Sequence, residues 1–367
     1  MKIEGVTLHH LQMKLQSPFE TSFGRIETRD CILVEVNSQG ITGWGECVAD
    51  RDPGYSAETS GTAWHILQDF LVPLVLGKRV DHPLDFHQLA AGVRGNPLAK
   101  AGLEMALWDA FGKQQGKSLR TLLGGELDKV AVGVSIGIQD SPEKLVEAAA
   151  EYLAQGYRRV KIKIKPGRDV GDTRAIRDAF PELPLQVDAN SAYTLETASA
   201  LKPLDAMGLL LIEQPLAEDD IWDHHFLQAE FDTPICLDES IHSLRHARQA
   251  LEMKATRVIN IKAGRVGGLS QGAAIHDLCQ REGIPVWCGG MLETGVGRAS
   301  NLGLATLPNF ALPGDISATE RYYAEDITNE VFVLNADSTI NVPDKPGLGV
   351  TINQAALKKV TLRKEVC

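Results

Sequence analysis

Short, largely apolar runs recur through the middle of the chain, and each run ends at a charged residue. The residues at these ends are spaced 25, 25, 25 and 24 positions apart, and they are Lys163, Asp188, Glu213, Asp238 and Lys262. A stretch long enough for a helix follows each run, and a strand followed by a crossover helix is the unit of a parallel sheet. Repetition of this unit predicts a (β/α) barrel whose charged side chains meet at the carboxyl ends of neighbouring strands.

The first part of the chain has a different pattern, because strands and helices do not alternate there. Residues 2–16 and 29–47 alternate between apolar and polar positions, which predicts antiparallel strands joined by a loop over 17–24. Helical spacing follows over about 57–76, 83–93 and 97–115, and a short helix over 119–123 ends at two glycines. Strands followed by helices predict a separate α+β module.

Alternation of strand and helix begins at Val130, with a first barrel strand predicted over 130–138 and its helix over 142–155. A segment near 311–315 is expected to close the ring as an eighth strand. The alternation stops at about residue 322, after which prolines and glycines accumulate. We expect this last segment to return to the N-terminal module.

Composition limits the partners that the protein can have. The chain has 367 residues, of which 44% are hydrophobic and 23% charged, so it can bury a barrel core and a smaller module. A formal net charge of -11 argues against nucleic-acid and anionic-membrane surfaces. There is no apolar run of transmembrane length and no secretory signal pattern at the start, and the six cysteines form no CxxC pair. We therefore expect a cytoplasmic protein with reduced thiols, which binds neither nucleic acid nor membrane. We also expect a homo-oligomer, which composition does not test.

The lysines of the second barrel strand are the first candidates for chemistry. Ile162 and Ile164 should face the helices, which places Lys161, Lys163 and Lys165 on the opposite face. A solvated strand end is the ordinary interpretation of such a run, but the apolar residues already occupy the outer layer. At least two lysines should therefore point into the barrel mouth, where clustered cations would lower each other's pKa and suit a general base.

Three carboxylates follow on consecutive strands. A single Asp at the end of a barrel strand commonly caps the next helix. Asp188, Glu213 and Asp238 together would repel one another strongly unless a cation lay among them. An all-oxygen set without His or Cys favours Mg²⁺, with Mn²⁺ or another divalent cation as a substitute, and disfavours zinc.

Lys262 should lie across the ring from Lys163, because about three strands of an eight-stranded barrel separate them. A substrate held at the metal would then have one ammonium group on each face. Arg265, three residues further on, either tunes the proton affinity of Lys262 or forms a surface salt bridge.

The two lysines of the KxK motif, the Asp/Glu/Asp set and Lys262 together resemble the muconate-lactonising branch of the enolase superfamily. Longer strings resemble its o-succinylbenzoate synthase and N-acylamino acid racemase group, and they lie at 18–24, 159–167, 187–193 and 287–295. The resemblance covers nearly the whole chain. It implies an α/β fold with a modified TIM barrel, (β/α)7β, over 126–321 and an α+β capping domain built from residues 1–125 and the returning segment 322–367.

The resemblance also implies a first chemical step. In this superfamily, a metal-bound carboxylate substrate loses the proton on its adjacent carbon to a base and becomes an enediolate. In a synthase, which dehydrates 2-succinyl-6-hydroxy-2,4-cyclohexadiene-1-carboxylate for menaquinone biosynthesis, Lys163 would take the proton while Lys262 stays charged. In an N-acylamino acid racemase, both lysines would exchange protons from opposite faces.

Further contacts with the small-molecule substrate are implied in the same way. Lys161 would bind the substrate, and the pocket would be lined by Ser135, Asn190, Gly290 and Met291. The loop over 21–24 would cover the site, where Phe23 either shields the acyl group from water or packs within the capping domain. The glycines at 289–290 either let the backbone approach a ligand or form a plain turn.

Several alternatives stay open. Dipeptide epimerases carry Asp-x-Asp after the eighth strand, whereas this chain has Asp315-Ile316-Ser317. A muconate cycloisomerase-like enzyme would share the lysines but not the Gly-Gly-Met string at 289–291. A non-catalytic ligand-binding barrel would have lost a ligand or a lysine, and all five positions are occupied. The residues do not decide between synthase and racemase.

Overall fold

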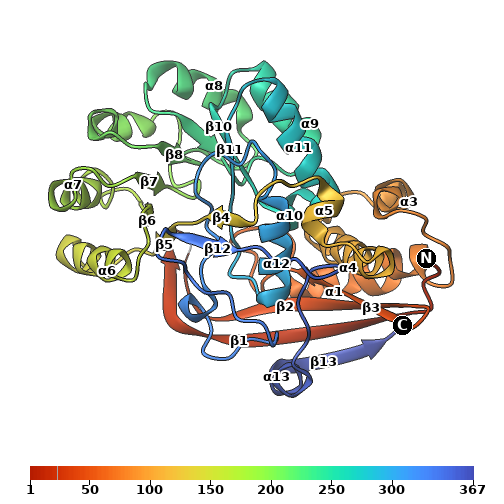
Figure 1. Ribbon diagram of the computed structural model, residues 1–367. Helices are drawn as coiled ribbons and strands as arrows, with labels where there is room; N and C mark the ends of the chain where they lie inside the picture. Colours follow the sequence, from red (N-terminus) through yellow and green to blue (C-terminus); the bar gives the residue numbers. More distant parts are fainter. Residues whose placement is uncertain (23) are drawn as a thin grey trace.

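The computed structural model describes residues 1–22 and 24–367, so Phe23 and its predicted role lie outside the described residues. A sheet of long antiparallel strands lies beside a curved parallel sheet that carries helices on its outer side (Figure 1). Within the described residues, no helix is long and apolar enough to cross a membrane.

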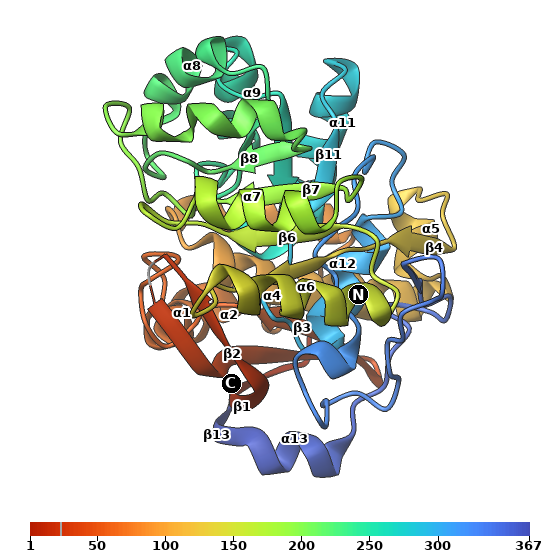
Figure 2. The same ribbon diagram turned by 90° about the vertical axis from the view of Figure 1, so that its left-hand side faces the viewer.

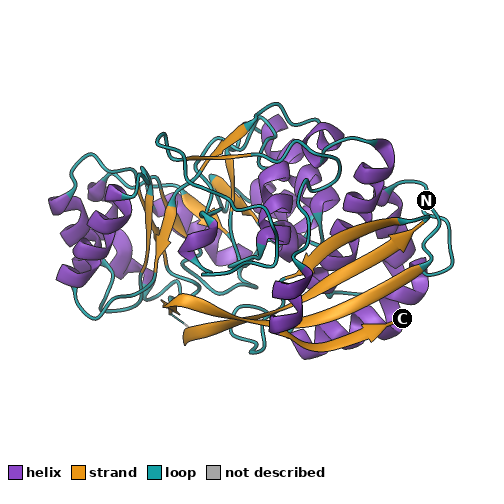
Figure 3. Ribbon diagram, turned by 60° about the horizontal axis from the view of Figure 1, so that its bottom comes forward, coloured by secondary structure: helices purple, strands orange, loops and turns teal. Residues whose placement is uncertain are grey.

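The N-terminal module contains a four-stranded antiparallel sheet in the order β13-β1-β2-β3. Its strands are β1 (Gly5–Thr21), β2 (Gly24–Ser38), β3 (Ile41–Cys47) and β13 (Thr361–Val366). Because β13 pairs with β1, the end of the chain lies against its beginning. Figure 3 shows this sheet with helices packed along one face. The domain boundaries after residues 125 and 321 stay a prediction.

The loop predicted over 17–24 is wrong for most of its length. Strand β1 continues to Thr21, and Phe19, Glu20 and Thr21 pair with residues of β2. The register shifts between Lys14 and Phe19, which places Pro18 in the irregular part of the ladder, where its missing N–H costs no regular hydrogen bond. The resulting long hairpin reaches the barrel, where the Ile138 N–H donates to the Glu20 carbonyl at 3.1 Å.

Helices cover this sheet. The predicted helix over 97–115 is confirmed as α4 (Pro97–Gln115), whose middle is buried on most sides because it lies between the sheet and the barrel. The stretches predicted over 57–76 and 83–93 form shorter pieces: α1 (Ser60–Ile66), a π-helical turn Leu67–Leu71, α2 (Val72–Val75) and α3 (Phe86–Leu89) flanked by 3₁₀ turns Pro83–Asp85 and Ala90–Gly92. The predicted short helix over 119–123 is confirmed as α5 (Leu119–Leu123). A helix near the C-terminus, α13 (Gln354–Val360), was not predicted.

In the described part of the chain, the barrel sheet holds seven parallel strands in the order β11-β10-β9-β8-β7-β6-β5. These are β5 (Val134–Ile136), β6 (Val160–Lys163), β7 (Leu185–Asp188), β8 (Leu211–Glu213), β9 (Ile235–Leu237), β10 (Val258–Ile261) and β11 (Val286–Cys288). Figure 2 shows β6, β7 and β8 of this sheet, with α7 (Val170–Ala179) in front of them. The segment 310–315 closes the ring, because it bridges Val286 on one side and Val132 on the other. The predicted eighth piece therefore lies where it was expected.

The predicted first strand over 130–138 is divided. Its start, β4 (Lys129–Ala131), pairs with β12 (Thr339–Asn341) in a two-stranded antiparallel sheet, while β5 stays in the barrel. Between them, the Gly133 N–H donates to the Gly314 carbonyl at 2.8 Å. The division follows from two sets of partners, which the local apolar pattern does not distinguish.

The helices of the barrel form its outer layer. They are α6 (Pro142–Ala154), α7 (Val170–Ala179), α8 (Ile221–Glu230), α9 (Leu244–Glu252), α10 (Ala263–Val266), α11 (Leu269–Arg281) and α12 (Gly295–Leu304), with a 3₁₀ turn at Thr319–Arg321. The crossover between β7 and β8 is a 3₁₀ helix (Ala198–Met207) instead, and it contains Pro203, which cannot donate an α-helical hydrogen bond.

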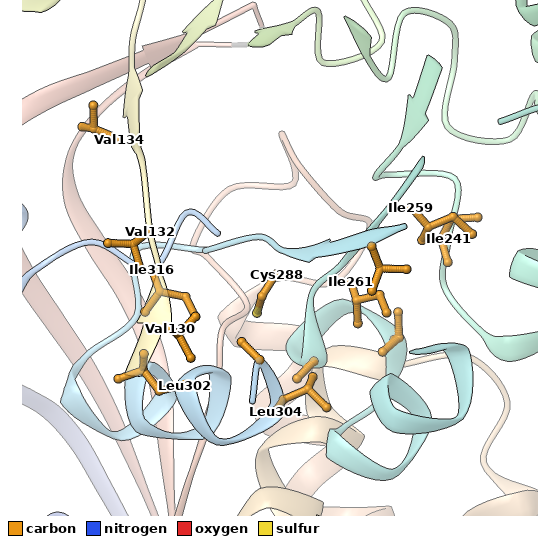
Figure 4. Packing of buried hydrophobic residues seen from close by; sticks show 14 of the residues in the cluster. Val130, Val132, Val134, Ile241, Ile259, Ile261, Cys288, Leu302, Leu304 and Ile316 are labelled. Carbon is orange, nitrogen blue, oxygen red and sulfur yellow. The ribbon is translucent and has the colours of Figure 1, made fainter. Parts of the chain in front are cut away.

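The largest of the apolar clusters extends through barrel and cap, and a second lies within the cap alone. Figure 4 shows part of the largest cluster, where Val132 and Ile316 lie near Leu302 of α12, and Ile261 of β10 lies on the other side of Cys288. Leu11 and Leu33 of the antiparallel sheet belong to the same cluster. The cap is therefore held to the barrel by shared burial, which keeps the mouth of the barrel in a constant position beneath it.

Candidate active site

The five charged residues of the repeat meet at one end of the parallel sheet. Lys163 lies opposite Asp188 in the ladder between β6 and β7, and Asp188 lies opposite Glu213 between β7 and β8. Asp238 and Lys262 directly follow β9 and β10. The three carboxylates are 0% exposed, and the two lysines are at most 8% exposed. Three strands separate β6 from β10, so the two lysines lie on opposite sides of the carboxylates.

The lysines of the KxK motif are paired with buried carboxylates. Lys161 Nζ lies 2.6 Å from Glu213, 2.7 Å from Asp315 and 3.1 Å from Asp188. Lys163 Nζ lies 2.6 Å from Asp188 and donates to Asn190 Oδ1 at 2.8 Å. These contacts orient both ammonium groups and restrict the rotation of both side chains.

The expectation that the clustered lysines of this run lower each other's pKa is wrong for Lys161, whose pKa is raised. Burial lowers the pKa of Lys161, but Asp315, Glu213 and Asp188 outweigh it and raise the pKa well above its ordinary value. Burial also lowers the pKa of Lys262, but the charges of Tyr55, Glu239 and Glu213 outweigh burial, so the pKa of Lys262 is raised as well. Anionic partners from distant segments decide the sign.

The third lysine of the run behaves differently. The Lys165 side chain is 40% exposed, and its nearest acidic partner is Glu20 of the hairpin at 3.7 Å. It therefore lies at the rim of the barrel, where a solvated lysine is expected.

Arg265 is 1% exposed, so its interpretation as a surface salt bridge is wrong. Its guanidinium contacts the Asp238 carboxylate and donates to the backbone carbonyls of Asn260 at 2.6 Å and Ile241 at 2.8 Å. Lys262 Nζ lies 2.7 Å from the other oxygen of Asp238. Arg265 and Lys262 thus share one carboxylate, which couples their charges.

The three carboxylates pair with cations of the chain itself. No group of three His, Cys, Asp or Glu side chains among residues 1–22 and 24–367 is arranged to hold a metal ion, and Lys161 bridges Asp188 and Glu213 instead. The chemistry of the donors fits nevertheless. Burial and the charge of Asp188 raise the pKa of Glu213, so two buried carboxylates compete for positive charge. Such an all-oxygen set suits a hard cation.

A cavity of about 300 Å³ opens above these charges, between barrel and cap. Lys161, Lys163 and Lys262 line it, and so do the four predicted pocket residues Ser135, Asn190, Gly290 and Met291. The cap contributes apolar and polar side chains on the other side, among them Phe19, Ile26, Arg29, Asp50 and Tyr55. A cavity of this size and mixed lining suits a small organic substrate.

Glycine at 289 and 290 is explained by close approach. Neither residue has a positive φ, so neither serves a left-handed turn. A Cβ at Gly289 would lie 2.3 Å from Asn260 Oδ1 and 2.7 Å from Lys262 Cε, and one at Gly290 would lie 2.6 Å from the Asp315 carbonyl. The absence of side chains therefore lets Lys262 occupy its position beside the cavity.

The site contains residues that the sequence analysis did not assign to it. Asp315 pairs with Arg159 at 2.7 Å as well as with Lys161. Glu239 accepts from Asn190 Nδ2 at 2.7 Å, and the Tyr55 hydroxyl donates to Asp238 at 3.1 Å. Two of these residues had a local signal, because Glu239 follows Asp238 in the sequence and Asp315 ends the predicted eighth segment.

Residues 144–356 match the family model for the enolase C-terminal domain-like fold, and residues 3–124 match the N-terminal domain of mandelate racemase and muconate lactonizing enzyme. The chain belongs to the enolase superfamily. Members of this superfamily with these two domains depend on a divalent metal. The fold, a modified TIM barrel with a capping domain, is the one that the superfamily resemblance implied.

Individual enolase superfamily relatives match along nearly the whole chain. The o-succinylbenzoate synthase of Geobacillus kaustophilus is 52% identical over 363 residues, which cover 98% of this chain and 96% of that protein. The N-succinylamino acid racemase of an Amycolatopsis species is 47% identical and covers 99% of both chains. The crystal structure of an enolase superfamily member from Listeria innocua superposes with a TM-score of 0.96 at 42% identity, covering 100% of this chain and 99% of that one.

Proposed function

We propose that the protein catalyses Mg²⁺-dependent removal of a proton next to a substrate carboxylate, as an o-succinylbenzoate synthase, an N-succinylamino acid racemase, or both. The observation that carries this proposal is the placement of two buried lysines, Lys163 and Lys262, on opposite sides of three buried carboxylates beneath one cavity. The two named relatives of similar length support the same pair of reactions.

The proposed ligands of the cation are Asp188, Glu213 and Asp238. When bound, Mg²⁺ would neutralise the substrate carboxylate and stabilise the negative charge that develops as the proton leaves. The chain's own groups then act on the substrate. Lys161 is held by the carboxylates of Asp188, Glu213 and Asp315. It would present a fixed positive charge to the substrate. The cap would exclude water from the cavity, which strengthens these electrostatic interactions.

Lys163 and Lys262 would hold and move the reacting proton. In the synthase reaction, Lys163 takes the proton and then assists loss of the hydroxyl group, while Lys262 remains charged beside the enediolate. In the racemase reaction, one lysine removes the proton from its face, and the other delivers a proton to the opposite face. A single arrangement of the two amines serves both reactions, so we propose that both are catalysed, with the synthase serving menaquinone biosynthesis.

Dipeptide epimerisation is less compatible with the site. A dipeptide carries a free ammonium group, which needs an acidic partner in the cavity. Asp315 is the acidic residue at the relevant position, but one of its oxygens pairs with Arg159 and the other with Lys161. Its single negative charge therefore already faces two cations. An N-acylated substrate, which has no ammonium group, fits this balance better.

Enantiomer-specific hydrogen exchange tests the proposal. With Mg²⁺ and an N-succinyl amino acid in D₂O, Lys262→Ala should retain exchange of the α-proton in one enantiomer, and Lys163→Ala should retain it only in the other. Racemisation needs both amines and should be lost in either variant. The loss for each missing base should be about 10²–10⁴-fold. Exchange of the same enantiomer by both variants would refute the two-face arrangement.

A further inference from the structure

Tyr55 is the residue through which the cap reaches the lysine on one face of the cavity. It lies in the loop between β3 and α1 and lines the cavity. Lys262 Nζ donates to the Tyr55 hydroxyl at 3.1 Å and lies 4.5 Å from the centre of its ring. The ring face and the hydroxyl therefore both contact the same ammonium group.

The Tyr55 hydroxyl also ties Lys262 to its charge partners. It donates to Asp238 Oδ1 at 3.1 Å and accepts from Arg265 Nη1 at 3.3 Å. Asp238 Oδ2 in turn lies 2.7 Å from Lys262 Nζ. The phenol, the carboxylate and the guanidinium thus form a closed network around one end of the lysine.

The lysine on the opposite face has a different environment. The contacts of Lys163 Nζ are with Asp188 and Asn190, both from the β7 end of the barrel. A flexible lysine chain has four rotatable carbon–carbon bonds, and each contact that restrains the amine reduces the conformations in which it misses the substrate. Loss of the Tyr55 contacts should therefore affect one face of the site more than the other.

We propose that Tyr55 is a positioning residue that holds the amine of Lys262 toward its face of the substrate. This inference rests on the proposed function, in which Lys262 and Lys163 act on opposite faces. The consequence is selective. Racemisation requires Lys262 to transfer a proton to a defined carbon, whereas the synthase reaction requires only its charge nearby. Racemase activity should thus depend on Tyr55 more than synthase activity does.

The experiment compares α-proton exchange of the two enantiomers of an N-succinyl amino acid in D₂O, at saturating Mg²⁺. Tyr55→Phe retains the ring and removes the hydroxyl, and Tyr55→Leu removes both. Tyr55→Phe should lower the rate of exchange by the Lys262 face about 10- to 100-fold, the size expected for a small misplacement of a reacting group. Exchange by the Lys163 face should stay within about twofold, and Tyr55→Leu should lower the Lys262 rate further.

Tyr193→Phe is the matched control. The Tyr193 side chain is buried, and its hydroxyl donates to the Asp169 carboxylate at 2.8 Å, but it does not line the cavity. Its removal deletes a comparable hydroxyl–carboxylate bond and should change both exchange rates equally. The ratio of the two rates within one protein sample is independent of the folded fraction, so a variant that folds poorly still reports on selectivity.

The outcomes separate this inference from the proposed function. The assignment of each enantiomer to a lysine comes from Lys163→Ala and Lys262→Ala, and failure of that assignment would overturn the proposed function itself. If the assignment holds, the decisive quantity is the exchange rate of the Lys262 face divided by that of the Lys163 face. An unchanged ratio in Tyr55→Phe overturns the role of Tyr55, whether both rates fall together or neither falls. A lowered ratio, with racemisation reduced more than synthase turnover, supports it.

Discussion

At the residue scale, the site is a balance of buried charges. Burial raises the pKa of Asp188, whereas the charges of Lys163 and Lys161 lower it. The effect of the lysines is larger, so the pKa of this carboxyl lies well below its usual range and the group stays ionised. Asp238 is shared by Lys262 and Arg265. Buried carboxylates with such partners stay ionised, so a divalent cation would bind them without first displacing a proton.

Asp238→Asn should weaken Mg²⁺ binding more than about tenfold, because the amide oxygen carries no full negative charge to attract the cation. Isothermal titration of the apo protein with Mg²⁺ or Mn²⁺ measures the affinity. Asp315→Asn is the control, since Asp315 lines the same cavity but pairs with Arg159 and Lys161 and is not a proposed ligand. Equal affinities of wild type and Asp238→Asn would exclude Asp238 as a ligand.

At the element scale, the cap is joined to the barrel through the start of α12. Glu46 of β3 accepts from the Thr294 hydroxyl at 2.5 Å and from the Gly297 N–H at 2.9 Å. Thr294 ends the loop that contributes Gly290 and Met291 to the cavity. Acidic groups are favourable at a helix N-terminus, so this contact fixes both α12 and the loop before it.

Glu46 makes this contact dependent on pH. Burial, together with the charge of Glu293, raises its pKa from 4.5 to about 7 against the hydrogen bonds from Thr294 and Gly297. The folded state therefore binds the proton of Glu46 more tightly than the unfolded state does. The contribution of Glu46 to the free energy of unfolding is complete below pH 4.5 and is lost as the pH rises through 7. A shift of this size corresponds to a decrease of about 3 kcal/mol in the free energy of unfolding.

Glu46→Gln should remove that pH dependence. We expect the difference in unfolding free energy between wild type and variant to fall by about 2–3 kcal/mol from pH 5 to pH 8. Urea titrations at several pH values give the free energies, and groups that titrate in both proteins cancel in the difference. Parallel stability curves over this range would show that Glu46 has the same proton affinity in the folded and unfolded chain.

At the scale of the whole molecule, segments from both ends of the chain share one structure. Asp109 of α4 accepts from the Trp44 N–H of β3 and from the Leu348 N–H of the C-terminal segment, each at 2.8 Å. Its other partner is Lys113, at 2.7 Å. The apolar core is also continuous between cap and barrel. Neither part can lose its structure without exposing surface of the other.

The protein should therefore unfold in one cooperative transition. Tryptophan fluorescence reports on buried side chains of the cap (Trp44, Trp64 and Trp108) and of the barrel (Trp287), while far-UV circular dichroism reports on backbone structure, chiefly the helices. The two signals should share one urea midpoint, because coincident probes are the mark of two-state unfolding. Two separated midpoints would show that cap and barrel are independent units.

Much of the fold and the centre of the site could be predicted, since both follow from local periodicity. Alternation along Val160–Lys165 places Lys161 and Lys163 on one face, because successive side chains of a strand point to opposite sides. The equal spacing of Asp188, Glu213 and Asp238 reflects one strand–helix unit for each carboxylate. The positions of these residues can therefore be predicted from their neighbours in the chain.

The hairpin and the first barrel strand were harder to predict. Residues 17–21 contain Pro18 and polar residues typical of a loop, yet they are held as a strand by pairing with β2 and by contact with Ile138. The split between β4 and β5 depends on β12, about two hundred residues later in the chain. Strand identity there depends on partners, which no local pattern contains.

The sequence by itself determined the barrel repeat, the carboxylates at its strand ends and the opposing lysines, because each is encoded by spacing within a few dozen residues. Only the tertiary structure decided which groups complete the site. Tyr55 lies 207 positions before Lys262, and Asp315 lies 156 positions after Arg159. Tyr55 sits outside any periodic pattern, and Asp315 ends the predicted eighth segment with no local sign of its partners. Their contacts, and the raised pKa values of Lys161 and Lys262, therefore exist only where folding brings distant charges together.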